Sequence, residues 1–201
     1  MFAQVIQGRV GDREALHAAF DRWMSELAPG SIGWLGTTAG VTKDGTCVVI
    51  ARFEDAQQAK ANSDRPEQDQ FWAETSTLFT GEVTFLDSSD VEVDLQGDPD
   101  RAGFVQVIRG RTSDPARVRE LMTQDSDEWA AFRPDILGTV SVSSGDAYTA
   151  VIYFTSEAEA REGEKKEMPE RMKAQMEEMN SLDLGEPTFL DLQDPWLYSP
   201  K

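Results

Sequence analysis

The hydrophobic pattern of the chain begins with a β-branched, strand-like segment at residues 2–10 and then changes to helical spacing. The next apolar side chains are spaced four, three and four residues apart: Leu16, Phe20, Trp23 and Leu27. This spacing places them on one face of a helix. Asp12 offers an N-cap and the Ala-Pro-Gly at 28–30 a stop, so the pattern predicts a strand followed by an amphipathic helix.

The first half of the chain continues as three further strands and two helical segments. A Lys-Asp-Gly turn at 43–45 makes the second and third strands antiparallel neighbours, and Pro66 divides the helical region in two. The expected strands are 34–38, 46–53 and 81–86, and the expected helices are 54–61 and 67–79. The order strand, helix, strand, strand, helix, strand predicts a four-stranded antiparallel sheet with helices on one face.

The second half of the chain repeats the first. Residues 2–12 return at 104–114 with seven of eleven positions identical, and residues 81–87 return at 185–191. Self-similarity over half of a chain indicates two copies of one module. Three parts are expected: a first module at 1–95, a linker at 96–103 and a second module at 104–201.

An acidic segment at 87–100 follows the first copy. Val91 and Leu95 within it suggest an extended arm, which Trp196 and Tyr198 echo at the C-terminal end. The segment lacks the DxDxDG order of a calcium loop, so we expect it to be a solvated linker.

The composition is acidic, with a formal net charge of −18 and 39% hydrophobic residues. This charge argues against nucleic acid and anionic membrane surfaces as partners. No run approaches the ~18 apolar residues of a membrane-spanning helix, and the first residues lack the basic start of a signal peptide, so we expect a cytoplasmic protein. Cys47 is the only cysteine, which excludes an intrachain disulfide and is typical of a small core residue.

The order of elements, the module length and the pairing of two modules resemble the dimeric α/β-barrel superfamily, in particular its antibiotic-biosynthesis-monooxygenase-like group. The resemblance implies an α+β fold in which two tandem ferredoxin-like modules pack sheet against sheet as an intrachain barrel. The usual dimer contact would then lie within one chain, so a monomer is expected. Space between the sheet and the helices of a module would suit a small hydrophobic or aromatic molecule.

The same resemblance implies a function, with a site expected in the first module. Members of this group oxidise a small aromatic or quinol-type substrate with oxygen and without a cofactor, using Asn, Trp, Arg and Tyr side chains, of which the first module has no Tyr. By residue type, the catalytic candidates are Asn62, Trp72 and Arg52. The candidates for binding a ligand are Gln4, Trp34, Arg65, His17 and Gln106. The alternative is a small-molecule-binding or structural barrel protein without catalysis, because fold analogy alone does not decide function.

These candidates also have structural interpretations. A glutamine within a strand, such as Gln4 or Gln106, either orients a ligand or ties strands together. Asn62 and Arg65 border Pro66 and could belong to a simple helix break. His17 lies beside the apolar stripe of its helix, as a partly exposed residue would.

Several cofactor classes are excluded by residue type. One histidine, one cysteine and no HExxH leave no ligand set for zinc or copper, so no metal is expected. No P-loop or GxGxxG is present, which argues against nucleotide cofactors. No histidine follows His17, so the second helix carries no axial ligand for haem.

Overall fold

The computed structural model describes residues 1–200 and divides into two compact units. The first unit comprises Met1–Val91 together with the C-terminal segment from Asp194, and the second comprises Glu92–Gln193. Each unit is α+β and has the ferredoxin-like order of elements that the sequence predicts. The packing of the two sheets into one barrel stays a prediction.

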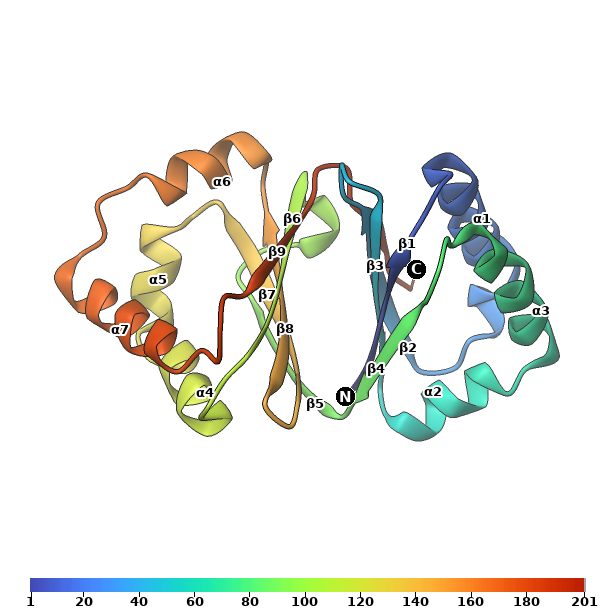
Figure 1. Cartoon of the computed structure of the whole chain (residues 1–201), viewed down its shortest axis with the longest axis horizontal. Helices are drawn as coiled ribbons and strands as arrows, with labels where there is room; N and C mark the ends of the chain where they lie inside the picture. The colour runs from blue at the N-terminus through green and yellow to red at the C-terminus, as the bar shows by residue number, and fades with distance from the viewer. Residues whose placement is uncertain (201) are drawn as a thin grey trace. The chain divides into compact units, whose positions relative to one another are not determined.

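The first unit contains a five-stranded sheet in the order β10-β2-β3-β1-β4. Its elements are β1 (Phe2–Arg9), α1 (Arg13–Glu26), β2 (Trp34–Val41), β3 (Thr46–Phe53), α2 (Ala56–Ser63), α3 (Pro66–Thr75), β4 (Thr84–Ser88) and β10 (Trp196–Tyr198), with single 3₁₀ turns at Ala28–Gly30 and Ser76–Leu78. Within this unit the three helices lie on one face of the sheet (Figure 1). Side chains on that face form the apolar core beneath the helices.

The second unit repeats the arrangement with a sheet in the order β5-β7-β8-β6-β9. Its elements are β5 (Asp90–Leu95), β6 (Phe104–Arg111), α4 (Pro115–Thr123), α5 (Ser126–Phe132), β7 (Ile136–Ser144), β8 (Ala147–Phe154), α6 (Glu157–Glu164), α7 (Glu170–Ser181) and β9 (Thr188–Leu192), with a 3₁₀ turn at Pro99–Arg101. Its four helices also lie on one face of its sheet (Figure 1).

Each sheet has one strand more than the four predicted. The extended arm after the first copy becomes β5 and joins the second sheet, and the C-terminal arm becomes β10 and joins the first, where Trp196 is paired with Ala39. The compact units therefore differ from the predicted parts, because 92–103 belongs to the second unit and 194–200 to the first. Each arm completes a sheet edge that its own copy does not form.

The two copies share the same local signals. Asp12 caps α1 by accepting from Ala15 N at 2.9 Å, and Asp114 caps α4 by accepting from Arg117 N at 3.0 Å, as the sequence predicts. After Asp114 the structure has two helices, because Asp125 has a φ of 60° and separates α4 from α5. A left-handed residue cannot continue a right-handed helix.

Cys47 is fully buried in the core of the first unit, and desolvation raises the pKa of its thiol to about 12, so it packs as a protonated core residue. No helix within residues 1–200 is long and apolar enough to cross a membrane.

Candidate functional site

A cavity of about 1050 Å³ lies in the second unit between the sheet and the helices α4, α5, α6 and α7. Its larger apolar lining residues are Leu121, Met122, Trp129, Ile136, Ile152, Phe154, Met176, Met179 and Phe189. Six charged side chains also line it: Glu92, Asp94, Arg133, Arg161, Glu164 and Asp191. A mostly apolar cavity with a few convergent polar groups is the usual form of a small-molecule site.

A row of three polar side chains runs along one wall of the cavity. Gln106 on β6 donates from Nε2 to Oδ1 of Asp191 on β9 at 2.9 Å. The guanidinium of Arg161 on α6 donates to the other oxygen of Asp191 and lies 5.1 Å from the ring centre of Phe104. Burial lowers the pKa of Arg161, but its bonds to Glu164 and Asp191 outweigh this and keep the pKa above its ordinary value. The wall therefore presents a permanent cation beside a carboxylate.

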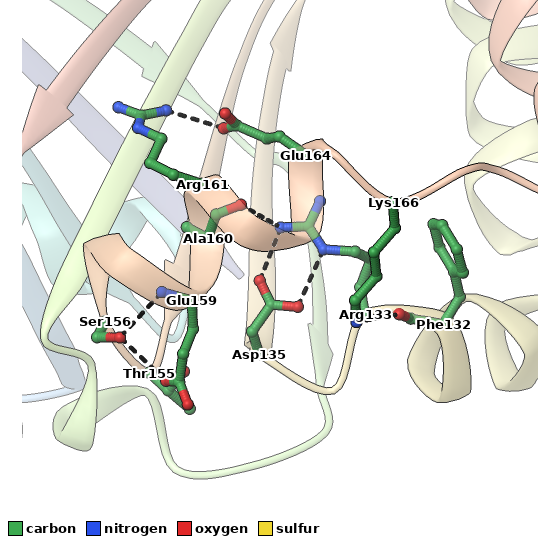
Figure 2. A network of polar contacts seen from close by, with 10 residues as sticks. All are labelled: Phe132, Arg133, Asp135, Thr155, Ser156, Glu159, Ala160, Arg161, Glu164 and Lys166. Atoms are coloured by element: carbon green, nitrogen blue, oxygen red, sulfur yellow. Dashed lines mark hydrogen bonds and ion pairs between the residues drawn. The ribbon is translucent and has the colours of Figure 1, made fainter.

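Arg133, just after α5, also lines the cavity. Figure 2 shows its guanidinium between Asp135 and helix α6. Its Nε and Nη2 donate to the two carboxylate oxygens of Asp135 at 2.9 and 2.7 Å, and Nη2 also donates to the Ala160 carbonyl at 3.3 Å. Helix α6 can lie this close because residue 163 is glycine: a Cβ on Gly163 would be 2.4 Å from Nε of Arg133. This buried pair joins the end of α5 to α6.

A tryptophan–glutamine pair holds the helices above the cavity. Trp129 Nε1 on α5 donates to Gln175 Oε1 on α7 at 2.9 Å, and Gln175 Nε2 donates to the carbonyl of Leu121 on α4. The first unit has the same pair, Trp23 Nε1 donating to Gln68 Oε1 at 2.8 Å. The pair is therefore part of the module, and in the second unit it joins α4, α5 and α7.

The corresponding space in the first unit is occupied by aromatic side chains. The repeated Leu-Gly-Thr triplet aligns Trp34 with Ile136. Trp34 is buried and meets Trp23 edge to face, with ring centres 5.0 Å apart, inside an apolar cluster. The other buried members of this cluster are Leu27, Phe53, Ala59 and Phe71. An isoleucine in the second unit thus stands where the first unit has a packed indole.

The two arms also differ, with aromatic residues in the first unit and acidic residues in the second. The repeated Phe-Leu-Asp triplet aligns the arm residues pairwise: Trp196 with Glu92, and Tyr198 with Asp94. Trp196 is buried and stacks on His17 with ring centres 4.4 Å apart. Glu92 instead forms an ion pair at 2.5 Å with Arg119, the counterpart of His17 on α4. The aromatic arm fills space beneath the helices of the first unit, and the acidic arm leaves it open in the second.

Asn62 and Arg65, predicted for a first-module pocket, bond to each other. Asn62 is 7% exposed, and its Oδ1 accepts from Arg65 Nη1 and from Ser31 Oγ, both at 2.9 Å. Arg65 also donates to the carbonyl of Leu27 at 3.1 Å. These bonds tie the end of α1 to the junction of α2 and α3, which is the structural interpretation of the helix break.

We expect Asn62→Ala to lower the free energy of unfolding by about 1–2 kcal/mol, because it removes the buried acceptor that the partly buried Ser31 and Arg65 donors share. Urea unfolding followed by circular dichroism measures this change. Asn180→Ala, on the exposed side of α7, is the matched control and should change stability by less than about 0.5 kcal/mol. An Asn62→Ala chain as stable as the parent would contradict this structural role.

The other two catalytic candidates do not meet Asn62. Arg52 pairs across the sheet with Ala3 and Gly36 and lies on the face opposite the helices, since its neighbours Ala51 and Phe53 face the helical core. Trp72 on α3 packs against Phe85, with ring centres 5.3 Å apart, and against Phe79. The catalytic roles of Arg52, Trp72 and Asn62 stay predictions, and the structure does not bring the three side chains together.

The four remaining candidates lie in different surroundings. Gln4 donates to Asp87 Oδ1 at 2.9 Å, and Trp34 Nε1 donates to Thr37 Oγ1 at 3.0 Å. The side chain of His17 is 43% exposed beside Trp196. Gln106 lines the cavity of the second unit.

Sequence reasoning missed Arg161 and Asp191. The sequence did contain a signal for Asp191. Asp87 and Asp191 each end a repeated Gly-Glu-x-Thr-Phe-Leu-Asp segment, and they lie opposite the repeated Gln4 and Gln106. The signal for Arg161 was absent, because it lies on a helix among exposed charges whose orientation the sequence does not reveal.

No protein-family model matches this sequence, and no curated protein is significantly similar to it. Solved structures do match. A presumed monooxygenase from Fusobacterium nucleatum subsp. nucleatum ATCC 25586 aligns with a TM-score of 0.76 and 11% identity, over 98% of this chain and 94% of that chain. A presumed monooxygenase from Lactobacillus acidophilus NCFM aligns with a TM-score of 0.74 and 13% identity, over 98% of each chain.

An anthrone oxidase-like protein aligns with a TM-score of 0.68 and 11% identity, over 98% of this chain and 92% of that chain. At these identities the likeness is one of fold. The chain thus has the tandem ferredoxin-like fold of monooxygenase-like proteins, which confirms the resemblance indicated by its sequence.

Proposed function

We propose that this chain binds a small, largely apolar aromatic molecule in the cavity of its second unit and oxidises it with molecular oxygen without a cofactor. The observation that carries the proposal is the cavity itself, whose volume of about 1050 Å³ and apolar walls suit a multi-ring ligand. The likeness to an anthrone oxidase-like protein and to presumed monooxygenases favours oxygen chemistry over other reactions.

The polar wall supplies the groups that this reaction needs. A substrate of the anthrone type loses a C–H proton to a base, and its anion gives two electrons to oxygen to form a carbon-bound hydroperoxide. Loss of water from the hydroperoxide then leaves a carbonyl, so CH₂ and O₂ become C=O and H₂O. Asp191 is the candidate base, and Arg161 lies beside it to stabilise the anion. Gln106 holds the carboxylate in place.

A second candidate function is binding without turnover. Both carboxylate oxygens of Asp191 already accept hydrogen bonds, one from Gln106 and one from Arg161. Hydrogen bonds to the charged form make a carboxylate a weaker base. This arrangement suits recognition of a ligand at least as well as proton removal.

Oxygen uptake separates the two functions. With anthrone in aerated buffer, the wild-type chain should consume oxygen and form anthraquinone faster than buffer alone, as followed with an oxygen electrode and by absorbance. Asp191→Asn should lower the rate by about 100-fold, because an amide is a poor base. The matched control is Asp87→Asn, which makes the same change at the equivalent residue, the partner of Gln4 in the first unit, and should leave the rate unchanged.

Calorimetric titration completes the experiment. Binding of anthrone without oxygen uptake would select the binding protein over the oxygenase. An absence of both would contradict the proposed function, and equal losses in Asp191→Asn and Asp87→Asn would contradict the assignment of the site to the second unit.

A further inference from the structure

Ser141 carries a polar atom for which the fold provides no partner. It lies on β7 and lines the cavity, and its Oγ is buried with no hydrogen-bond partner among residues 1–200. A buried hydroxyl without a partner costs a protein about 1–3 kcal/mol. The directly opposite residue on β8 is Ala150, and the next pair on the same face of the sheet joins Thr139 to Ile152. Ser141 therefore lines the cavity from the face of the sheet that also carries Thr139 and Ile152.

The first unit has an apolar residue at the equivalent position. The repeated Leu-Gly-Thr triplet aligns Ser141 with Ala39, which is 0% exposed and packs in a core cluster beside Trp196. Nothing in the module itself requires a hydroxyl there. A serine in the second unit lowers the stability of the ligand-free fold unless a bound molecule pairs with it.

The charges around the cavity indicate which molecules can be that partner. Four carboxylates and two guanidinium groups line it, a net charge of −2: Glu92, Asp94, Glu164, Asp191, Arg133 and Arg161. Arg133 and Arg161 are both already paired with carboxylates. An anionic ligand would enter against this field, whereas a neutral one would not.

We propose that Ser141 is a specificity-determining residue whose hydroxyl hydrogen-bonds a carbonyl or hydroxyl oxygen of an uncharged, planar ligand. This inference rests on the proposed function in one respect, that the cavity of the second unit binds a small aromatic molecule. It adds the polar group that recognises the ligand, and it specifies that the ligand is uncharged.

Three probes of one ring system test the inference: 2-naphthol, naphthalene and 2-naphthoate, titrated by calorimetry at neutral pH. The wild-type chain should bind 2-naphthol best and 2-naphthoate worst. Ser141→Ala should weaken binding of 2-naphthol by about 3- to 10-fold, the value of one net hydrogen bond, and leave binding of naphthalene unchanged. The Tm of ligand-free Ser141→Ala should equal or exceed that of the wild type, since the variant removes an unpaired hydroxyl.

Ala39→Ser is the matched control, because it places the same hydroxyl at the equivalent position of the first unit. It should lower the Tm and leave all three affinities unchanged. Equal weakening of 2-naphthol and naphthalene by Ser141→Ala, or a lower Tm of its ligand-free form, would assign the hydroxyl to the fold and overturn the inference. Binding of 2-naphthoate as tight as that of 2-naphthol would overturn the neutral ligand. If none of the probes binds the wild-type chain, the proposed function fails together with this inference.

Discussion

Replacing Arg133 with methionine should lower the free energy of unfolding by about 3–5 kcal/mol, the cost of leaving a buried charge without its partner. The Arg133 and Asp135 side chains are only 13% and 8% exposed, and two hydrogen bonds join them. Arg133 also contacts helix α6: it donates to the Ala160 carbonyl and packs against Gly163. Removing the guanidinium therefore leaves the Asp135 carboxylate buried without its partner, and it also removes the hydrogen bond to α6. Urea unfolding followed by circular dichroism measures the loss.

The double variant Arg133→Met with Asp135→Leu separates these effects. Removing both charges should recover most of the stability, because buried ion pairs can often be exchanged for apolar groups of similar volume. Lys60→Met is the matched control: it breaks the exposed pair with Asp64 and should change stability by less than about 1 kcal/mol. A loss in Arg133→Met no greater than in Lys60→Met would show that the buried pair does not support the fold.

Transplanting the aromatic residues of the first unit into the second should abolish ligand binding. The triple variant Ile136→Trp, Glu92→Trp and Asp94→Tyr places two indoles and a phenol at the positions that Trp34, Trp196 and Tyr198 occupy in the other copy. Three large side chains would take the space of a planar ligand, so 2-naphthol affinity should fall by more than about 1000-fold, equivalent to about 4 kcal/mol. Calorimetric titration measures the change.

The triple variant is expected to fold, because the other copy of the module accepts these residues. Arg119 loses its pair with Glu92 but gains an aromatic face on which a guanidinium can stack. The control is Glu92→Gln, which removes the charge without adding bulk and should keep affinity within about 3-fold. Binding by a folded triple variant, checked by its thermal transition, would contradict the assignment of the cavity as the ligand site.

The contrast between the two units follows from the duplication. Both copies keep the elements that build the module: the aspartate N-caps, the tryptophan–glutamine pair and the glutamine–aspartate pair between strands. They differ where side chains meet beneath the helices, at Trp34 and Ile136 and at Ala39 and Ser141. The first copy is packed at these positions, and the second has the cavity in which we propose that a ligand binds.

The sequence by itself determined the number of modules and the order of their elements. These features rest on local signals: the repeat of residues 2–12, the apolar spacing from Leu16 to Leu27, the N-cap aspartates and the break at Pro66. Each of them acts over a few residues, so a linear pattern contains it. The resemblance drawn from these patterns agrees with the fold of the solved structures.

Only the tertiary structure decided which sheet each arm completes and where the cavity lies. The pairing of Trp196 with Ala39 joins residues far apart in the sequence, and no pattern near either one specifies it. The cavity is lined by side chains from nine elements, among them Ile136 on β7 and Met176 on α7, so no single stretch of sequence specifies it. The sequence favoured the first module because its candidates, among them Asn62, Trp72 and Arg52, combine more polar and aromatic chemistry than their counterparts in the second. Burial reversed that preference, because those residues bond to and pack on one another, and a cavity forms where packing is incomplete.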